Sequence, residues 1–516
     1  MKIAKTLFCL AAMAAATSQG ETVPGVVVAH QEASTRQYIG SPSIVIAPDG
    51  SYVATHDFFG PGSTSTVSAE TEVLISKDRG LSWTHVALLK EQFWSNLFML
   101  KNRIYLMGTS FEYGRIVLRT SDDNGRSWSE THYLTQDNGY HTAPVPVVVH
   151  NGRVYRAFEF HPTGPWGSFQ AFVMSAPVEA DLLAAASWTF SNRLSFPVGD
   201  EGDTWLEGNA VVASDGSIVD VLRVSNQQHV AVLKLQGNNL KLDRFVGFPG
   251  GATKFAIRFD PVSKLYWTVA NPALPGESDA VRSPGSVRNT LAVLSSPDLT
   301  NWTPRTVIVQ NPDAKLHGFQ YADWQFDGKD LIVLSRTAFD DGAGGAHSFH
   351  DANYLTFHRV LSFRTLKTIE LKGKQFATAE VIPSELMAKI TADTTSNAAK
   401  SKGGVFPQRL GDYGNHTTTL TTRVATGDAE QHRDWSDVFV IVKGQAKLIS
   451  GGSLRNPRTT SPGEEKASGI SGGEEQMLQA GAVVHISPGV PHQLMLPPAG
   501  TLTYYVVKVR AENSTR

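Results

Sequence analysis

The sequence predicts an all-β protein in which a β-propeller of six units is followed by a small β-barrel. A pattern of paired apolar runs and tight turns repeats six times between residue 42 and about residue 365, and a different pattern of short strands begins near residue 405. Turn-forming residues are abundant, with 45 Gly and 26 Pro in 516 residues. Charges nearly cancel, with 46 Lys and Arg against 48 Asp and Glu, which argues against nucleic-acid binding through bulk charge.

Residues 1–20 have the pattern of a secretory signal peptide. Lys2 and Lys5 precede an apolar run over residues 7–16, which small residues follow. That run has about half the length of a membrane anchor, and no later segment is long and apolar enough to span a bilayer. The protein is therefore expected to be exported, to the periplasm or outside the cell. Cys9 is the only cysteine and leaves with the signal, so the mature chain has no disulfide.

Each repeated unit consists of an apolar run, a tight turn, a second apolar run and an outer hairpin. Four short strands in a unit of this length are typical of a propeller blade. A seventh blade would have to lie in residues 163–205 or be completed by the early strand Gly25–Ala29. The six first turns, which follow one another at intervals of 47–65 residues, are Asp49-Gly50, Lys101-Asn102, Asn151-Gly152, Asp215-Gly216, Val262-Ser263 and Asp327-Gly328.

Two outer hairpins carry a sharper motif. SKDRGLSW at 76–83 and SDDNGRSW at 121–128 match S-x-D-x-G-x-x-W, and this motif resembles the Asp-box of sialidase-like propellers. SSPDLTNW at 295–302 and the stretch ending at Trp188 resemble decayed copies. In this motif Asp caps the turn, Gly allows a positive φ, and Trp is buried between blades. We interpret the Asp-box aspartates as structural, because these turns lie on the outside of a propeller.

Propeller geometry predicts where ligands bind, because inner-strand starts and second-strand ends meet at one face of the central channel. Cations near aromatic side chains on that face, with Trp94, Trp205 and Trp324 nearby, suit an anionic sugar. The inner-strand starts offer Arg36, Tyr38, Asn96, Tyr140, His141, Asn209, Lys254, Gln320 and Tyr321. The second-strand ends offer His56, Asp57, Tyr113, Arg115, Arg156, Glu159, Arg223 and Arg336.

The sialidase family departs from this sequence at one point. Its members place an Arg directly before the Pro of the first inner strand and use three arginines to hold a carboxylate. Here the equivalent stretch, Tyr38-Ile-Gly40-Ser-Pro42, has no Arg at that position. A sialidase-like exo-hydrolase is therefore kept as an alternative to the following resemblance.

Two longer stretches, RQYIGSPSIVIAPDGSYVATHDFFGPGS at 36–63 and SRTAFDDGAGGAHSFHDANYLTFHRVLSFR at 335–364, resemble L-rhamnose-α-1,4-D-glucuronate lyases. Members of this family were first described as α-L-rhamnosidases, and the resemblance spans most of residues 30–365. It implies a seven-bladed propeller, one blade more than the repeat count. It also implies release of terminal L-rhamnose from glucuronate on arabinogalactan or gum-type glycans by β-elimination. The key histidine of the family follows an inner hairpin of the first blade, which is the position of His56 here.

The chemistry of elimination fits the residue types on the predicted face. A uronate carboxylate must be neutralised, for which Arg156 or Arg223 is suited, and a histidine can take the C5 proton near neutral pH. No cofactor is required for this scheme, and the one ion considered for the propeller is a structural calcium ion. The predicted catalytic residues are His56, His141 and Tyr140. The predicted substrate-binding residues are Arg156, Arg223, Lys254, Arg336, Trp205 and Asn209.

Three alternatives for the propeller stay open. Hydrolysis usually needs two carboxylates, and Asp57 and Glu159 are the obvious pair on the predicted face, so the residue count favours elimination. An exo-acting α-L-rhamnosidase or a sialidase-like hydrolase would use the same scaffold. A non-catalytic propeller that binds glycans is the third alternative. In all three, the expected partner is an anionic oligosaccharide or polysaccharide.

Composition changes after the propeller, which is predicted to cover residues 21–366. Residues 367–404 are predicted to be a linker with one short helix at 383–392, and residues 405–516 a second domain. HRDWSDVFVIVKG at 432–444 and GAVVHISPGVPHQ at 481–493 resemble the two cupin motifs. The resemblance implies a small β-barrel, and cupin barrels often associate, so a homodimer through this domain is compatible with it.

The cupin resemblance also implies a metal site. When Asp437 is matched to the carboxylate position, the usual first histidine of the motif becomes Glu430. Two histidines and two carboxylates suit a divalent transition metal, whereas many cupins hold none. The predicted metal ligands are Glu430, His432, Asp437 and His492.

Overall fold

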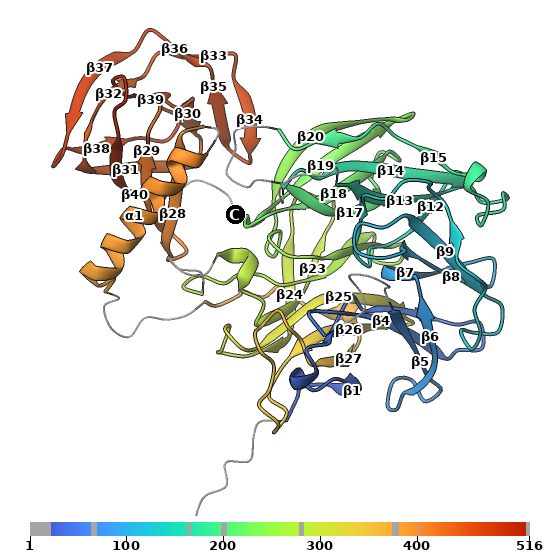
Figure 1. Ribbon diagram of the computed structural model, residues 1–516. Helices are drawn as coiled ribbons and strands as arrows, with labels where there is room; N and C mark the ends of the chain where they lie inside the picture. The colour runs from blue at the N-terminus through green and yellow to red at the C-terminus, as the bar shows by residue number, and fades with distance from the viewer. Residues whose placement is uncertain are drawn as a thin grey trace, which may run out of the picture.

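Strands form nearly all of the regular structure in the computed structural model (Figure 1). Within the described residues, six antiparallel sheets between Val26 and Val360 are arranged around a common centre, and further sheets follow in the C-terminal part. The predicted all-β propeller of six units is therefore confirmed. The structure describes residues 22–62, 70–161, 167–197, 204–277, 283–373, 381–401 and 403–511. The predicted signal peptide and Cys9 lie outside these ranges.

The first three blades follow the chain in order, and in each of them the strand nearest the centre comes early. The first blade contains β2 (Tyr38–Ile39), β3 (Ser43–Ile46), β4 (Tyr52–Phe59), β5 (Glu70–Ser76) and β6 (Thr84–Lys90). The second contains β7 (Phe93–Leu100), β8 (Arg103–Thr109), β9 (Ile116–Ser121) and β10 (His132–Tyr133). The third contains β11 (Tyr140–His141), β12 (Val148–His150), β13 (Arg153–Phe160), β14 (Gln170–Pro177), β15 (Thr189–Phe190) and β16 (Leu194–Ser195).

The last three blades have four strands each. The fourth contains β17 (Trp205–Val212), β18 (Ile218–Val224), β19 (His229–Gln236) and β20 (Asn239–Gly247). The fifth contains β21 (Ala256–Asp260), β22 (Leu265–Ala270), β23 (Thr290–Ser296) and β24 (Thr303–Gln310). The sixth contains β25 (Gly318–Asp327), β26 (Asp330–Ala338), β27 (Tyr354–Val360) and the early strand β1 (Val26–His30). Short 3-10 helices lie at Ala33–Thr35, Ala185–Ser187, Pro284–Ser286 and Phe363–Thr365.

A seventh blade is not formed by the described residues, so the count implied by the lyase resemblance is wrong for this chain. Strand β1 pairs with β27 and completes the sixth blade instead of a further one. Strands β15 and β16 pair with β14 and belong to the third blade. Ring closure is completed at the centre, where the Asp323 carboxylate of β25 accepts hydrogen bonds from the Ser43 hydroxyl (2.7 Å) and the Ile44 amide (3.0 Å). A ring closed by its first strand needs no further blade to cover an open edge.

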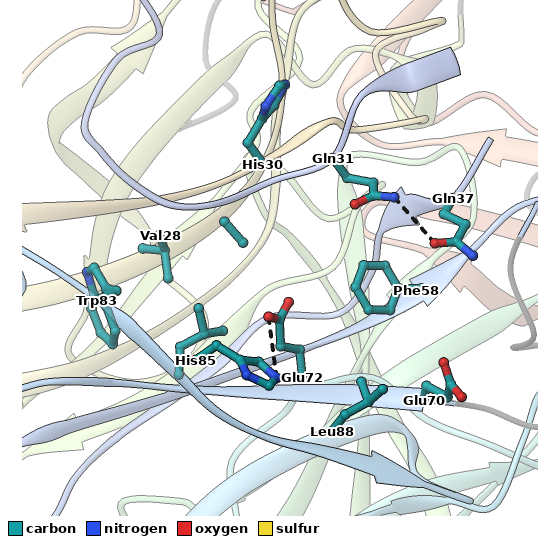
Figure 2. A pocket seen from close by; sticks show the side chains of 12 residues that line it. Val28, His30, Gln31, Gln37, Phe58, Glu70, Glu72, Trp83, His85 and Leu88 are labelled. Carbon is teal, nitrogen blue, oxygen red and sulfur yellow. Dashed lines mark hydrogen bonds and ion pairs between the residues drawn. The ribbon is translucent and has the colours of Figure 1, made fainter. Parts of the chain in front are cut away.

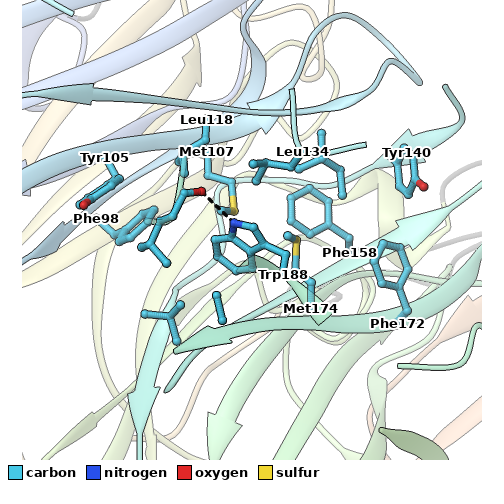
Figure 3. Packing of buried hydrophobic residues seen from close by; sticks show 14 residues of the cluster. Phe98, Tyr105, Met107, Leu118, Leu134, Tyr140, Phe158, Phe172, Met174 and Trp188 are labelled. Atoms are coloured by element: carbon cyan, nitrogen blue, oxygen red, sulfur yellow. Dashed lines mark hydrogen bonds between the residues drawn. The ribbon is translucent and has the colours of Figure 1, made fainter. Parts of the chain in front are cut away.

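The space between neighbouring blades is filled by large apolar side chains (Figure 3). Between the second and third blades, Trp188 is 5% exposed and packs in one cluster with Phe158 and Met174. Its indole Nε1 donates a hydrogen bond to the Leu182 carbonyl at 2.8 Å, so the polar atom is satisfied within the core. The decayed motif that ends at Trp188 therefore keeps the packing function of the Asp-box tryptophan.

The Asp-box aspartates cap their turns, as predicted. Asp78 accepts a hydrogen bond from the Ser82 amide at 2.9 Å, and Asp123 accepts one from the Ser127 amide at 2.9 Å. Asp298 does the same for the Asn301 amide at 2.8 Å, in the motif read as a decayed copy. Several local donors aimed at one carboxylate explain why the pKa of Asp78 is lowered to about 2, the Ser82 hydroxyl being the largest cause.

The predicted linker contains a longer helix than expected. Helix α1 (Ser384–Lys400) continues eight residues past the predicted end, through a stretch that the polar composition had suggested was unstructured. Ile390, Thr394 and Ala398 are buried and recur every four residues, so one face of the helix packs while the rest is solvated. The Thr394 and Thr422 hydroxyls lie 3.0 Å apart across this contact. Tertiary packing against β28 (Val405–Asp412) and β29 (His416–Arg423) therefore outweighs the weak local helix propensity.

The C-terminal part contains two larger sheets and a two-stranded ribbon. The five-stranded sheet orders β28 (Val405–Asp412), β29 (His416–Arg423), β40 (Leu502–Arg510), β31 (Trp435–Lys443) and β38 (Val483–Ile486). The six-stranded sheet orders β34 (Arg458–Ser461), β35 (Glu464–Ala467), β30 (Ala429–His432), β39 (His492–Met495), β32 (Gln445–Ser450) and β37 (Glu474–Gln479). The ribbon pairs β33 (Ser453–Arg455) with β36 (Gly469–Ser471).

The two parts of the chain touch. Strand β20 of the fourth blade contacts β34, and the Gly276 amide donates a hydrogen bond to the Asp412 carbonyl at 2.7 Å. Among the described residues, no helix combines the length and apolar character that crossing a membrane requires.

Candidate functional site

Three inner strands share a local distortion that turns one side chain toward the propeller axis. The ladders of β7, β17 and β25 each shift register, and one residue in each bulge has a positive φ: Trp94 at 48°, Glu207 at 59° and Tyr321 at 52°. A bulge re-aims a side chain out of the regular alternation, and a non-glycine residue with positive φ is strained. Strain that recurs at equivalent positions in three blades marks this end of the channel as a candidate site.

Tyr321 and Glu207 meet at the centre of this end of the channel. The Tyr321 hydroxyl donates a hydrogen bond to Glu207 Oε1 at 2.9 Å, although the two residues lie on the sixth and fourth blades. Glu207 is 2% exposed, whereas Tyr321 is only half-buried. Burial alone would raise the pKa of Glu207, but the neighbouring Arg223 holds it below its usual value. An ionised carboxylate is therefore in place to accept the phenol proton.

Three arginines surround this pair. Arg223 donates from Nη1 to Glu207 Oε2 at 2.8 Å, and the guanidinium carbons of Arg288 and Arg336 lie 5.6 Å and 4.9 Å from the Tyr321 ring centre. Burial lowers the pKa of Arg336 to about 10, which still leaves it charged at neutral pH. Three guanidiniums against the carboxylate of Glu207 leave the centre with excess positive charge. Planar guanidiniums in such a group are suited to a carboxylate or another oxyanion.

Two of these arginines have unused donors. The Nε atoms of Arg223 and Arg336 are buried and have no hydrogen-bond partner within the described part of the chain. Buried donors are normally satisfied, so these two Nε groups are exceptions to the usual pattern. Arg288 differs, because its Nε donates to the Gly285 carbonyl at 2.9 Å and its Nη1 donates to Gln320. Arg223 and Arg336 are held as well, by Glu207 and by the His350 carbonyl, so all three arginines are fixed by the protein.

Asp57 supplies a second carboxyl group near the arginines. Its two oxygens accept hydrogen bonds from the amides of Ser41 (2.5 Å) and Trp94 (2.6 Å). Burial, with the side chain in the core, raises the pKa of Asp57 to about 6, and the positive charge of Arg336 is among the smaller effects that oppose it. A β-carbon added at Gly40 would lie 1.7 Å from Asp57 Oδ1, so only glycine fits there. The Asp57 carboxyl group is therefore protonated below about pH 6 and ionised above it.

His141 lies at the edge of the same centre. Its Nδ1 is 2.9 Å from Glu159 Oε2, and its ring contacts those of Trp94 (4.6 Å between centroids) and Phe169 (4.8 Å). The other oxygen of Glu159 accepts a hydrogen bond from the Gly208 amide at 2.9 Å, next to Glu207. Glu159 thus fixes both the histidine ring and the bulge that carries Glu207.

Several predicted substrate-binding residues are used inside the protein. Arg156 is fully buried and donates to Asn96 Oδ1 (2.9 Å), the Thr142 hydroxyl and two backbone carbonyls. Asn209 accepts from the Ile257 amide at 2.9 Å and joins the fourth blade to the fifth. These contacts make both residues parts of the ring interior, and the structure does not bring them to the Tyr321–Glu207 pair.

Lys254 supports the site through the backbone of the β25 bulge. Its ammonium group donates to the Ala322 carbonyl at 2.7 Å, next to the strained Tyr321. Burial lowers the pKa of Lys254 to about 7. The lysine therefore bonds the backbone of the bulge, and its predicted contact with substrate has no support in this position.

Tyr140 and Trp205 belong to interblade packing. The Tyr140 ring lies in the apolar cluster between the second and third blades, and its hydroxyl accepts a hydrogen bond from Arg193 at 3.1 Å. Trp205 is 0% exposed and packs against Phe196. Of the predicted site residues of the propeller, the structure gathers His141, Arg223 and Arg336 at the centre.

His56 faces away from the centre. It is 0% exposed, its Nε2 is 2.9 Å from Glu72 Oε2, and its Nδ1 is 3.1 Å from the Asp57 carbonyl. Because side chains alternate along β4, His56 and Phe58 share one face of the strand and Asp57 takes the other. The structure therefore separates His56 from His141, and its predicted catalytic role stays a prediction without a contact to the central residues.

Glu207 and Arg288 are the residues that sequence reasoning missed. In a regular strand, the Glu207 side chain would point to one face of its blade and not toward the propeller axis. Strand alternation alone therefore does not predict its position in the site. A signal for it exists in retrospect: each bulge consists of a functional side chain, a small residue and an Asn or Asp. The three copies are Trp94-Ser95-Asn96, Glu207-Gly208-Asn209 and Tyr321-Ala322-Asp323.

The four predicted metal ligands of the C-terminal part do come together. Ligand atoms of Glu430, His432 and His492 lie within 4.8 Å of one another. Asp437 Oδ2 is 3.2 Å from His432 Nε2 and 3.7 Å from His492 Nε2, and its Oδ1 is buried without a hydrogen-bond partner among the described residues. Two imidazoles and two carboxylates at these spacings fit a divalent transition metal.

One of the side chains around this cluster favours metal binding, and two others oppose it. Glu464 contacts His432 Nδ1, which is the carboxylate contact that orients many metal-binding histidines. Arg423 pairs with Glu430 at 2.8 Å, and the Lys508 ammonium lies 3.2 Å from His432 Nε2, so positive charge is also close. No other group of three such side chains is found in the described residues, and the structural calcium of the propeller stays a prediction.

No family model matches this chain, and no curated protein matches it. Among solved structures, it is similar to Trypanosoma rangeli sialidase, with 12% identity, 95% of each chain covered and a TM-score of 0.46. It is also similar to a Penicillium chrysogenum α-L-arabinanase complexed with arabinobiose, with 12% identity, 66% of this chain and 99% of the other covered and a TM-score of 0.44. A Fusarium graminearum α-L-arabinofuranosidase shows 9% identity, coverage of 66% and 98%, and a TM-score of 0.42.

These likenesses are too distant to transfer an activity. The sheets themselves define the class of the protein: an all-β chain with a six-bladed propeller and a smaller β-sheet unit after it.

Proposed function

We propose that the propeller is a retaining exo-glycoside hydrolase that removes a terminal sugar bearing a carboxylate. The observation that carries this proposal is the 2.9 Å hydrogen bond from Tyr321 to the ionised Glu207, within a group of three arginines. Tyrosine replaces the usual carboxylate nucleophile in glycosidases that act on sialic acid. A neutral phenol approaches an anionic sugar without the charge repulsion that a carboxylate nucleophile would meet.

The expected reaction has two displacement steps. Tyr321 attacks the anomeric carbon while its proton passes to Glu207, and the glycosidic bond breaks as its oxygen takes a proton from Asp57. Water then attacks the glycosyl-tyrosine, with the Asp57 carboxylate accepting a proton of the water and Glu207 returning one to the phenolate. Arg223 and Arg336 would bind the sugar carboxylate through their guanidinium groups, which lie beside Glu207 and Tyr321. Protonation, nucleophilic attack and anion binding are thus assigned to different residues.

A second candidate is the β-elimination implied by the lyase resemblance. The observation in its favour is the His141–Glu159 pair, since a histidine held through Nδ1 by a carboxylate can present Nε2 as a base. Release of L-rhamnose from glucuronate would then use His141 to take the C5 proton and Arg223 to neutralise the carboxylate. In this form the elimination does not need His56, Tyr140 or Arg156.

One incubation separates the two candidates. The protein is incubated with gum arabic and, separately, with α-linked sialyllactose, and products are followed by chromatography and ultraviolet absorbance. Release of an acidic terminal sugar without a new chromophore is the expected result, and release of a neutral sugar alone would contradict the proposed specificity for a sugar that bears a carboxylate. Rhamnose with an ultraviolet-absorbing unsaturated uronate would overturn the hydrolase proposal in favour of elimination. Binding of either glycan with no released sugar at all would instead favour the non-catalytic alternative.

We also propose that the C-terminal part is a cupin-type barrel that holds a divalent transition metal through Glu430, His432, Asp437 and His492. The support is the convergence of these side chains and the open Asp437 oxygen. A metal ion held there would supply Lewis acidity or stabilise the barrel.

Replacing one histidine of this cluster is expected to remove the metal. His492→Ala should weaken Zn²⁺ or Mn²⁺ binding at least ~100-fold, because a site with one ligand fewer loses a direct bond to the ion. Metal content of the full-length chain is measured by mass spectrometry after dialysis. His485→Ala is the matched control, since His485 is exposed on the neighbouring strand β38. Equal metal content in the wild type, His492→Ala and His485→Ala would contradict the assignment.

A further inference from the structure

A cleft of about 560 Å³ lies between the first and sixth blades, away from the propeller axis (Figure 2). Its walls come from β1, from β4, β5 and β6, and from the chain that leads out of β1. The volume lies within the range of small-ligand pockets, about 300–1,000 Å³. The site of Tyr321 and Glu207 does not include any of the residues that line it.

The cleft is nevertheless only one strand away from that site. Phe58 of β4 lines the cleft, and the fully buried His56 lies beneath it, with ring centroids 4.9 Å apart. Asp57, between them in sequence, points to the opposite face and receives the Trp94 amide. Strand β4 therefore separates the cleft from the central site, and the two differ in chemistry.

Aromatic and polar groups alternate around the cleft. Trp83 and Phe58 lie on opposite sides of it, and the Glu72 and His85 side chains lie between them (Figure 2). Glu70 and the hydrogen-bonded pair Gln31 and Gln37 add further oxygen and nitrogen atoms along the rim. Aromatic faces for C–H groups and amide or carboxylate groups for hydroxyls are the two kinds of contact that a sugar ring uses.

The charges of the lining exclude other ligand classes. Of the described residues that line the cleft, none is Lys or Arg, so an anion would meet carboxylates without a counter-charge. A metal cation is disfavoured too, because the Glu72 carboxylate is already shared between His56 at 2.9 Å and His85 at 3.7 Å. That leaves Glu70 as a lone free carboxylate among the described groups, which is too few ligands for a cation site. An uncharged, hydroxyl-rich ligand is the class that fits.

We propose that this cleft binds one or two neutral sugar units. It would hold an uncharged part of a glycan, while the central site holds its acidic end. The inference rests on the proposed function only in taking a glycan as the natural ligand. Trp83 supplies the aromatic face and Glu70 a hydroxyl acceptor.

Calorimetric titration of the full-length protein with lactose, cellobiose and xylobiose tests this site. At least one of these neutral disaccharides is expected to bind with millimolar affinity or better, and Ca²⁺ and N-acetylneuraminic acid are titrated as charged probes. Trp83→Ala and Glu70→Gln should each weaken the binding at least ~10-fold. Trp128→Ala is the matched control, since Trp128 holds the same motif position one blade further on, with its Nε1 on the Gly125 carbonyl at 3.0 Å.

The outcomes are distinguishable. Absence of binding by all three disaccharides overturns the proposal, as does binding that both Trp83→Ala and Glu70→Gln leave unchanged. Ca²⁺ binding that is lost in Glu70→Gln, with no sugar binding, would make the cleft a cation site and would also overturn it. Glu70→Gln keeps the test valid if Trp83→Ala fails to fold, because Glu70 is partly exposed and the substitution keeps the size of the side chain. Glycan hydrolysis with no disaccharide binding rejects this inference alone, and the reverse result rejects the proposed function alone.

Discussion

A Tyr321→Phe variant is expected to lose at least ~10³-fold in kcat for release of the terminal acidic sugar while keeping its fold. The phenol oxygen is the proposed nucleophile, and no other hydroxyl among the described residues occupies its place on the Glu207 carboxylate. The fold should survive because Glu207 keeps its ion pair with Arg223 at 2.8 Å when the tyrosine hydroxyl is removed. Activity is measured with sialyllactose or whichever glycan the wild type hydrolyses, and folding is measured by thermal unfolding.

Three further variants make this result specific. Glu207→Gln should lose activity to a similar extent, and the double variant should lose little more, because nucleophile and base act as one unit. Tyr113→Phe is the control, since Tyr113 is a half-buried tyrosine close to His141 that is not hydrogen-bonded to Glu207. A Tyr321→Phe protein with more than a tenth of wild-type kcat would contradict the nucleophile assignment.

The blade pattern was predictable because its turns form through contacts between residues that are close in the sequence. Tight turns such as Asp49-Gly50 and the Asp-box hairpins recur at regular intervals, and each needs only nearby residues to form. The number of blades depends instead on how the ring closes. Strand β1 closes it by pairing with β27, more than 320 residues away in sequence, and a local pattern does not contain that pairing.

Site residues were predictable where they lie on regular strand ends. Arg223 and Arg336 end the second strands of their blades and reach the axis as expected. Glu207 and Tyr321 reach it through bulges with positive φ, and a period of two does not describe a bulged strand. Tyr321 was noticed as a strand-end residue, but its role depends on Glu207, and only the assembled ring places the two in contact.

His56 and Asp57 show that a position at a strand end does not by itself predict the direction of the side chain. Both were assigned to the channel face from their place at the end of β4, yet neighbouring residues of a strand point in opposite directions. Asp57 faces the arginines and His56 faces the outer cleft. The metal cluster was easier, since the resemblance to two motifs named four residues and the barrel strands bring all four together.

Asp57→Asn is expected to separate acid catalysis from nucleophilic attack. Burial raises the pKa of Asp57 to about 6, so the protonated acid that the first step requires is present below that pH and is lost as pH rises through it. The kcat/KM of the wild type on a glycan with a poor leaving group should therefore fall about tenfold per pH unit above about 6. The side-chain amide of the Asp57→Asn variant does not titrate, so this variant should show a flat profile over this range and a rate lower by ~10²–10⁴-fold.

The effect of Asp57→Asn is expected to depend on the leaving group of the substrate. A nitrophenyl glycoside of the same sugar departs without a proton, so Asp57→Asn should slow its glycosyl-transfer step less than ~10-fold. Asp78→Asn is the matched control, because Asp78 lies in an outer turn of the same blade and keeps the acid at the centre intact. Equal losses on both substrates would mean that Asp57 positions Trp94 or the arginines and that another group, with His141 the first to examine, gives up the proton.

The same substitution also has a signature in stability. A buried carboxyl whose pKa rises from 3.8 to about 6 on folding stabilises the protein fully below pH 3.8, and this contribution is lost as pH rises through about 6. The difference corresponds to about 3 kcal/mol in the free energy of unfolding. Denaturant unfolding at pH 4 and pH 7 should therefore show a larger decrease for the wild type than for Asp57→Asn. The same decrease in both proteins would place the acid limb on another residue, since a carboxyl without a raised pKa has no proton to donate at the working pH.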